Sequence, residues 1–322
     1  MEMEVDLVST GARRLRQKIV RRIGAWRDAQ EERDQRGQWF LLTGTCPVYA
    51  PEALTTAELH PLYPPEEVFW ADPFVWSRDG RSFVFFEERR YRIRRGHIRA
   101  WELDQGGRPQ GRSFAVIDEP YHLSYPHLFE DGGDLYMVPE KAEQRRVDVY
   151  GCIRFPERWE KVATLIDGAR LSDPTVFHHL GRWWLFCAAS RGRMRVNETL
   201  MAFHADSPLA QRWTPHPGNP IVRDFSRGRP AGRVQRDASD RLLRPGQDCV
   251  RRYGYGVTLN QIVELTPERY REQCVWRASG PAIGGWRGMH HIDWRDGLLV
   301  MDAQRLIPGR RPPPDPQATG PR

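Results

Sequence analysis

Lysine, paired cysteine and long apolar runs are scarce or missing in this sequence, and each shortage excludes a class of protein. Of the 49 basic residues, only Lys18, Lys141 and Lys161 are lysines. The five cysteines are scattered, without a CxxC pair or the His and Cys spacing of a zinc site. No run approaches the ~18–20 apolar residues of a membrane span, and the N-terminus lacks the apolar core of a secretory signal. We therefore expect a reduced protein that is cytoplasmic or attached peripherally at the inner membrane.

The motifs of several cofactor and hydrolase classes are missing as well. The GYGV segment at 254–257 does not sit between a strand and a helix, so it does not indicate a Gly-rich phosphate loop. No GxSxG elbow is present. Histidines cluster only in two adjacent pairs, His178–His179 and His290–His291. The sequence therefore predicts no cofactor and no metal site.

The two ends of the chain differ from its middle. Residues 11–36 form the one clear helical stretch, in which Leu15, Ile19, Ile23 and Trp26 share a stripe and arginines cover the rest. Such a basic amphipathic helix either packs on its own domain or contacts an anionic membrane through residues 11–27. The proline-rich end has no apolar periodicity. We predict an N-terminal helix region at 1–37, one domain at 38–307 and a disordered tail at 308–322.

The middle of the chain reads as short strands joined by turns, and these hairpins recur. The pairs include WADPFVW with RSFVFFEE, YPHLFE with DLYMVPE, and DPTVFHHL with RWWLFCAA. Pro73, Pro126, Pro174 and Pro230 mark successive units and lie 53, 48 and 56 residues apart, and a last hairpin begins at HHIDW. A period of ~50 residues is typical of a β-propeller. The predicted fold is all-β, a five-bladed β-propeller preceded by a basic amphipathic helix.

Polar residues recur where the first strand of each predicted unit begins. The innermost strands of a propeller converge on a central cavity, so such residues face one another across it. The catalytic candidates are the carboxyl groups of Asp72, Asp173, Glu140 and Asp248. The substrate-binding candidates are Glu88, Ser124, His127, Arg229, Arg244, Gln247, His290 and His291. Glu87 lies beside Glu88, and only one histidine of an adjacent pair is expected to line the cavity, because neighbours on a strand point to opposite faces.

Carboxyl groups with histidines and arginines around one pocket have two chemical uses. Two carboxyl groups can act as general acid and general base on a glycosidic bond. They can also hold a polyhydroxylated ligand by hydrogen bonds while Trp and Tyr rings stack on the sugar. Both uses indicate that the substrate or ligand is a carbohydrate. An Asp before Pro often only caps a turn, but the recurrence of Asp72 and Asp173 at near-multiples of the period favours the cavity.

An ordered series of segments resembles a known family. The series includes WADPFVW, FFEE, YHLSYPHLFE, DPTVFHHL, RPAG, LLRPGQDC and YGYGV. It is similar to the N-terminal propeller domain of glucosamine inositolphosphorylceramide transferases and their stand-alone bacterial relatives. That domain is similar in fold to the five-bladed glycoside hydrolases of family 43.

The resemblance to those hydrolases implies roles for three positions. Asp72 matches the first-blade Asp that acts as general base, and Asp173 matches the third-blade Asp that tunes pKa values. Where the fourth blade of those enzymes carries the Glu that acts as general acid, this chain has Arg229. This departure argues against simple inverting hydrolysis, unless Glu140 or Asp248 supplies the proton.

Two functions are consistent with these residues. One is a carbohydrate-active enzyme, hydrolase-like or transglycosylase, in which Arg229 and Arg244 bind a phosphate or uronate group. The other is a non-catalytic glycan or nucleotide-sugar recognition module that assists a glycosyltransferase in cell-surface polysaccharide or glycolipid biosynthesis. Pairing of Arg229 with the aspartates would favour the second. Nucleic acid is not expected as a partner, because outside the N-terminal helix the arginines alternate with acidic residues, as in ERWEK.

Overall fold

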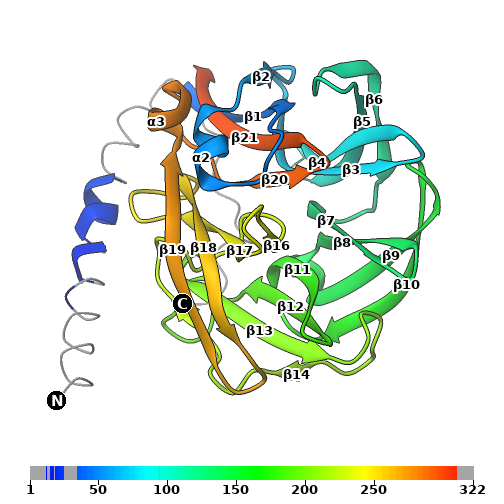
Figure 1. Ribbon diagram of the computed structural model, residues 1–322. Coiled ribbons are helices and arrows are strands. Elements are labelled where there is room, and N and C mark those ends of the chain that lie inside the picture. Colours follow the sequence, from blue (N-terminus) through cyan, green and yellow to red (C-terminus); the bar gives the residue numbers. More distant parts are fainter. Residues whose placement is uncertain (1–11, 13–14, 18, 25–34, 94, 310–322) are drawn as a thin grey trace.

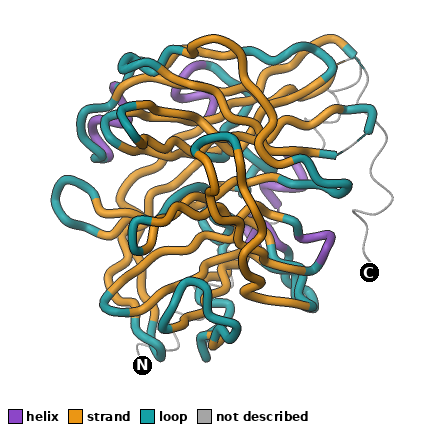
Figure 2. Tube along the Cα trace, turned by 90° about the vertical axis from the view of Figure 1, so that its right-hand side faces the viewer, coloured by secondary structure: helices purple, strands orange, loops and turns teal. Residues whose placement is uncertain are grey.

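The structure is a computed structural model that describes residues 12, 15–17, 19–24, 35–93 and 95–309. The predicted tail at 308–322 lies outside the described residues from position 310 onward. Within these residues, five antiparallel sheets form the five predicted blades of a β-propeller (Figure 1). Strands and turns dominate the trace, and helices are few and short (Figure 2).

The blades follow the chain in order. Blade 1 contains β3 (Val68–Arg78), β4 (Arg81–Arg90), β5 (Gly96–Leu103) and β6 (Pro109–Ile117). Blade 2 contains β7 (Ser124–Asp131), β8 (Asp134–Glu140), β9 (Arg146–Arg154) and β10 (Arg158–Asp167). Blade 3 contains β11 (Ser172–His179), β12 (Arg182–Ala188), β13 (Thr199–Ala205) and β14 (Thr214–Pro215), and β15 (Val222–Arg223) also pairs with β13. Blade 4 contains β16 (Gln235–Arg236), β17 (Leu242–Asp248), β18 (Gly256–Leu265) and β19 (Tyr270–Ser279).

The fifth blade joins the two ends of the propeller. It places β1 (Gln35–Thr45) and β2 (Leu59–Leu62) beside β20 (Ile292–Arg295) and β21 (Leu298–Pro308). The pairing of β1 with β21 runs from Gln35 opposite Pro308 to Thr45 opposite Leu298. The short helices α2 (Pro51–Thr56) and α3 (Gly280–Gly284) and the 3₁₀ turns η1 (Ala142–Gln144) and η2 (Val196–Glu198) lie in the connections. Closure by strands from both ends removes two exposed sheet edges.

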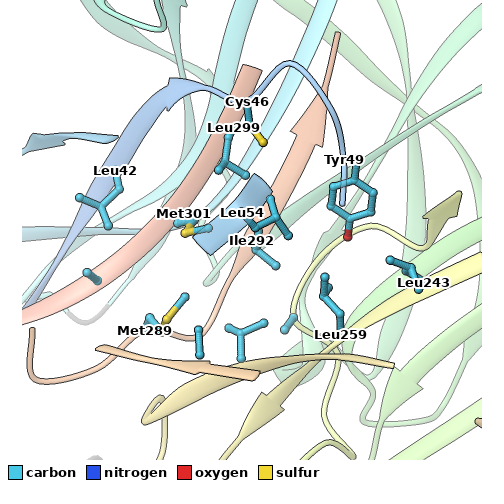
Figure 3. Packing of buried hydrophobic residues seen from close by; sticks show 14 of the residues in the cluster. Leu42, Cys46, Tyr49, Leu54, Leu243, Leu259, Met289, Ile292, Leu299 and Met301 are labelled. Atoms are coloured by element: carbon cyan, nitrogen blue, oxygen red, sulfur yellow. The ribbon is translucent and has the colours of Figure 1, made fainter. Parts of the chain in front are cut away.

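Apolar side chains fill the spaces between adjacent blades. Figure 3 shows the cluster in which Leu243 and Leu259 of blade 4 meet Leu42, Leu299 and Met301 of blade 5. Aromatic rings dominate the corresponding cluster between blades 1 and 2. Large rings suit this position because each buries much area between two twisted sheets.

The inner strands of blades 1, 2 and 3 share one backbone irregularity. Asp72, Tyr125 and Asp173 each precede a proline and have positive φ angles of 54°, 46° and 54°. At each site the register of the inner strand shifts against its neighbour, as in a β-bulge. A bulge redirects a side chain away from the regular alternation. A non-glycine residue with positive φ costs about 1–3 kcal/mol, so three such residues at equivalent positions indicate a functional constraint.

The N-terminal helix packs on the propeller, but not through its predicted apolar stripe. Gln17 Nε2 donates to Asp224 Oδ1 at 2.7 Å, and the Arg21 guanidinium lies 4.0 Å from the Phe225 ring centroid. Leu15, Ile19 and Ile23 are 62%, 51% and 51% exposed. Trp26, the fourth residue of the predicted stripe, lies outside the described residues. In the part of the chain that the structure describes, none of the helices has the length and apolarity needed to span a membrane.

Candidate functional site where the inner strands begin

A group of charged side chains gathers where the inner strands begin. We call it the axial cluster and define it as Asp72, Glu87, Glu140, Asp173, Arg229, His290 and Asp302. Asp302 on β21 holds one side of it together. Its carboxylate accepts hydrogen bonds from the backbone N–H groups of Asp72 at 3.0 Å, His290 at 2.9 Å and His291 at 3.0 Å. These bonds link blade 1 to blade 5.

His290 lies between two carboxylates. Its Nδ1 is 2.6 Å from Asp302 Oδ2, and its Nε2 is 3.7 Å from Asp72 Oδ1. The imidazole stacks on the Trp39 ring with centroids 4.1 Å apart. Burial alone would lower the pKa of His290, but the two carboxylates, Asp302 above all, raise it on balance. The same interaction lowers the pKa of Asp302 despite its burial.

The pKa of the Asp72 carboxyl group lies near neutral pH. Burial raises its pKa to about 7, and the negative charges of Asp173 and Asp302 act in the same direction, while His290 and Arg229 oppose them. The side chain therefore exchanges a proton near neutral pH. A group with such a pKa can serve as a base or as a hydrogen-bond donor to a ligand, depending on its protonation state.

Both histidines of the pair contact Asp72, which corrects the expectation from strand alternation. His291 Nδ1 lies 3.8 Å from Asp72 Oδ1, close to the His290 distance. The expectation failed because residues 289–291 precede β20 and are not in a strand. His291 is fully buried against the rings of Phe74 and Tyr125, and burial lowers its pKa to about 3. Burial thus favours the neutral form of His291, whereas the carboxylates beside His290 raise its pKa.

Arg229 and Asp173 form a paired charge on the other side of the cluster. Arg229 Nε donates to Asp173 Oδ2 at 2.5 Å and Nη2 donates to Oδ1 at 3.1 Å. Nη1 donates to Asn197 Oδ1 at 3.1 Å, and the guanidinium lies 5.1 Å from the Tyr253 ring centroid. Gln247 Nε2 also approaches Asp173 Oδ2, at 3.4 Å. Arg229 thus neutralises Asp173, at the position where the resemblance to family 43 hydrolases led us to expect a general acid.

Glu140 lies beside this pair. Its Oε2 accepts the backbone N–H of Asp173 at 2.9 Å and lies 4.0 Å from Arg229 Nη2. Burial and the charge of Asp173 raise the pKa of Glu140 well above its usual value. The backbone of Ser124 pairs with Glu140, which places this predicted residue next to the cluster at the start of β7.

Glu87, rather than its neighbour Glu88, belongs to the axial cluster. Burial and the charge of Asp72 raise the pKa of Glu87 to about 8. Glu88 points to the other face of β4, where its Oε2 accepts from Trp70 Nε1 at 2.9 Å. Its Oε1 lies 3.5 Å from His97 Nε2. Glu88 is therefore bonded within blade 1, and the side chain on the cluster side of this strand is Glu87.

Arg244 and Asp248 are not brought to the cluster. The Arg244 guanidinium is buried and bonds Glu272 twice, each at 2.8 Å. Asp248 accepts from the backbone of Val250 and lies 3.7 Å from Arg277 Nη1. Both residues lie on the face of β17 opposite Gln247, as the alternation of a strand requires. The predicted anion-binding role of Arg244 and the predicted acid role of Asp248 are therefore not supported by their positions.

His127 also has a structural setting instead of the predicted binding position. It is fully buried, and its Nε2 lies 2.7 Å from the carbonyl oxygen of Val176 in blade 3. Burial lowers its pKa to about 3. The hydrogen bond joins blades 2 and 3 two residues beyond the bulge at Tyr125.

Asp72, His290 and Asp302 are also the residues whose ligand atoms come close enough for one metal ion, within 4.8 Å of one another among the described residues. Asp302 accepts three backbone N–H groups and its Oδ2 lies 2.6 Å from His290 Nδ1, while the Asp72 carboxylate lies 3.7 Å from His290 Nε2.

Sequence reasoning missed several members of the site. Asp302 and Trp39 come from segments that carry no recurring motif, so nothing in the sequence marked them, whereas Tyr253 opens the YGYGV segment of the family resemblance, which gave it no role. Tyr125 did carry a signal, because it precedes Pro126 as Asp72 and Asp173 precede their prolines. Its hydroxyl lies 2.8 Å from Thr175 Oγ1 and accepts the backbone N–H of Gly232 at 3.0 Å, which connects blades 2, 3 and 4.

Comparison with known proteins gives consistent matches. The family model described as glucosamine inositolphosphorylceramide transferase 1, N-terminal, matches residues 33–297. The transferase of that name from Oryza sativa subsp. japonica is 36% identical over 254 residues, which cover 75% of this chain and 34% of that protein. The one from Arabidopsis thaliana is 33% identical over 291 residues, which cover 86% of this chain and 37% of that protein. The chain thus spans about a third of the length of these relatives.

Two solved structures share the fold. The catalytic domain of the Coprinopsis cinerea GH62 alpha-L-arabinofuranosidase aligns with a TM-score of 0.54 and 12% identity, covering 73% of this chain and 90% of that one. An exo-beta-1,3-galactanase from Clostridium thermocellum aligns with a TM-score of 0.52 and 13% identity, covering 74% of this chain and 59% of that one. At this identity the likeness concerns the fold alone.

Proposed function

Because the chain belongs to the family of the N-terminal region of glucosamine inositolphosphorylceramide transferase 1, we propose that its axial cluster binds the sugar part of a glycoconjugate. In this proposal the propeller is a recognition module that assists a glycosyltransferase. The fold is that of glycoside hydrolases, and the curated relatives are transferases. The observation that carries the choice of binding over cleavage is the double hydrogen bond of Arg229 to Asp173.

The pairing removes two requirements of glycosidic hydrolysis. The fourth-blade position supplies a cation that cannot donate a proton at neutral pH. Asp173 is engaged by Arg229, so it does not act as a free carboxylate. The remaining polar groups still suit a polyhydroxylated ligand, because carboxyl groups, the Asn197 amide and the Gln247 amide offer both donors and acceptors.

The charge balance of the cluster predicts which sugars bind. Carboxyl groups outnumber cationic groups in it, and the Arg229 charge is already neutralised by Asp173. We therefore expect neutral or amino sugars to bind better than uronates or sugar phosphates, which reverses the expectation from the sequence. Tyr253 is 42% exposed beside Arg229 and His290, and its ring offers a stacking surface to the ligand.

An array of neutral, amino and acidic glycans, followed by calorimetric titration of the hits, tests this proposal. We expect Tyr253→Ala to weaken binding of a hit by about tenfold, since an aromatic contact contributes roughly 0.5–1.5 kcal/mol beyond its buried area. Tyr255→Ala is the matched control, because Tyr255 lies two residues away among Arg251 and Arg252. Equal losses in both variants, or selective binding of acidic glycans, would contradict the proposal.

Glycosyl transfer or hydrolysis is the second candidate function, and the raised pKa of Glu140 favours it. A Glu that keeps its proton at neutral pH can act as general acid, with Asp72 as the base. The variant Glu140→Gln separates the two functions, because a Gln oxygen still accepts the Asp173 N–H. Recognition predicts no product from either the parent chain or the variant, whereas catalysis predicts release of a reducing sugar or transfer product that this substitution abolishes.

The wider setting is part of the same proposal. A glycosyltransferase is the expected protein partner, in biosynthesis of a cell-surface polysaccharide or glycolipid. We also propose that the protein is cytoplasmic and that residues 11–27 contact a membrane peripherally. Co-purification of the chain with a glycosyltransferase from its own source, lost when the partner gene is deleted, is the expected result.

A further inference from the structure

The N-terminal helix lies next to a basic loop at the same end of the propeller as the axial cluster. The loop joins β12 to β13 and carries Arg191, Arg193 and Arg195, all exposed. The same loop provides Asn197, which bonds Arg229 of the cluster. Burial lowers the pKa of Arg21 in the helix most. The positive charge of Arg195 in the loop lies close enough to lower it further.

Helix and loop are fixed to the propeller at this end. The helix contacts Asp224 and Phe225, which lead directly into Arg229 along the chain. A side chain at position 24 would meet the carbonyl oxygen of Arg251 at 2.3 Å, so Gly24 permits close contact of the helix with the segment after β17. Gln247 near the end of β17 reaches Asp173. The helix therefore lies at the rim around the cluster, not at the far end of the blades.

Charge and apolar surface are arranged as on a membrane-binding face. The stripe of Leu15, Ile19 and Ile23 is exposed on the helix side that does not contact the propeller. The nearby acidic groups are buried and bonded inward: Asp224 accepts from Gln17, and Glu198 accepts the backbone N–H of Arg195. The sequence has no acidic residue between Asp6 and Asp28 or between Asp173 and Glu198. Every charged residue of the sequence at 12–24 and at 189–197 is therefore basic.

We propose that the helix stripe and the β12–β13 loop together form a docking surface for an anionic lipid bilayer, which turns the axial cluster toward the membrane. The aliphatic side chains enter the boundary between headgroups and acyl chains, and the arginines bind the anionic headgroups. The apolar stripe favours a bilayer over a soluble polyanion, which would gain nothing from three aliphatic side chains. A ligand that reaches the cluster then approaches from the bilayer surface.

Vesicle co-sedimentation of the full chain tests the surface, with phosphatidylcholine vesicles compared with vesicles that also contain phosphatidylglycerol. We expect binding to the anionic vesicles at low salt and its loss at high salt, because salt screens the arginines. Leu15→Gln/Ile19→Gln/Ile23→Gln keeps good helix formers and should raise the lipid concentration for half-maximal binding at least about tenfold. Arg191→Gln/Arg193→Gln should raise it by a similar factor.

Leu180→Gln and Arg182→Gln are the matched controls. Leu180 lies in the β11–β12 turn and is 79% exposed, and Arg182 is the first residue of β12. The β11 strand begins beside Asp173 and ends before this turn, which places the turn about 20 Å away at ~3.3 Å per residue. These controls should bind vesicles like the parent chain. Equal loss in controls and test variants, or no preference for anionic vesicles, would overturn the proposal.

Two further measurements fix the orientation and the occupant. An environment-sensitive fluorophore on Arg193→Cys, in a chain with Cys152→Ser and Cys274→Ser, should shift to the blue with anionic vesicles, whereas one on Leu180→Cys should not. Reversed shifts would refute the orientation.

Sedimentation velocity without lipid should show a monomer, and a dimer broken by the helix variant would assign the stripe to a second copy instead. Glycan titration without vesicles should be unchanged in all surface variants, so failure of the docking surface and failure of sugar binding are separable.

Discussion

Replacing Asp72 by Asn should stabilise the protein above neutral pH, because the folded chain holds this carboxylate at an energetic cost. Burial raises the pKa of Asp72 to about 7, compared with 3.8 for an exposed carboxyl group. The folded state thus binds the proton more tightly than the unfolded state. The stability contributed by this proton is complete below pH 3.8 and is lost as pH rises through 7.

The difference between the pKa of Asp72 in the folded and unfolded chain sets the size of the expected gain in unfolding free energy. At 1.36 kcal/mol per pKa unit, the charged form of Asp72 costs about 4 kcal/mol at pH 8.5 and under about 2 kcal/mol at pH 5. Asn is the matched replacement because it tolerates the positive φ of 54° at this position. The expected gain in unfolding free energy for Asp72→Asn is therefore up to about 4 kcal/mol at pH 8.5, and it shrinks toward zero near pH 4.

Urea unfolding of the parent chain and Asp72→Asn at pH 5, 7 and 8.5 measures this gain. Asp302→Asn is the contrasting control, since its carboxylate accepts three backbone N–H groups and interaction with His290 lowers its pKa. Asp302→Asn should destabilise the chain at neutral pH, and the loss should shrink as pH falls through the pKa of Asp302. If Asp72→Asn were equally destabilised at pH 5 and pH 8.5, the reasoning from buried charge would be refuted.

Substitutions at Arg244, at Tyr125 and at the Glu87–Glu88 pair separate structural residues from members of the site. Arg244→Met should cost about 1.5–3 kcal/mol, because Glu272 loses the buried partner that bonds it twice and keeps Arg227 and Tyr270, and urea unfolding should show part of that loss recovered in Arg244→Met/Glu272→Met. Sugar affinity in this double variant should equal that of the parent chain, and a selective loss of acidic glycans would restore the predicted anion-binding role. Tyr125→Phe should cost about 1–3 kcal/mol in thermal or urea unfolding, because the buried Gly232 N–H loses its acceptor. Glu88→Gln should leave sugar affinity unchanged in calorimetry while Glu87→Gln alters it, and the opposite order would return the binding role to Glu88.

The blade pattern was predictable from the sequence because its cause is local. Each hairpin needs turn residues at its tip, and the inner strands of blades 1, 2 and 3 carry a proline at the bulge, so the ~50-residue period is visible in Pro73, Pro126 and Pro174. The closure of blade 5 was not visible, because β1 and β21 pair across the whole length of the chain. The membership of β2 in that blade likewise depends on a long-range contact.

Within the site, residues at the bulges were predictable and their partners were not. Asp72 and Asp173 were found through the motif that each shares with the other. The choice between Glu87 and Glu88, or between Gln247 and its neighbours, depends on which face of a strand points to the axis. A shift of one residue reverses that face, and the sequence fixes the strand only to within a residue or two. The role of His290 depends on Asp302, which the sequence did not mark.

The placement of the energetic costs argues that the axial cluster was selected for binding and not for stability. Three residues with positive φ, at Asp72, Tyr125 and Asp173, occur at equivalent positions of neighbouring blades. The carboxyl groups with raised pKa, Asp72, Glu87 and Glu140, lie at the same end. A propeller needs neither feature to fold, since its blades are held by sheet pairing and by apolar contacts between them. Strained backbone angles and buried carboxyl groups with raised pKa occur together where a protein binds or reacts. A ligand that hydrogen-bonds these carboxyl groups would recover part of the free-energy cost of burying them.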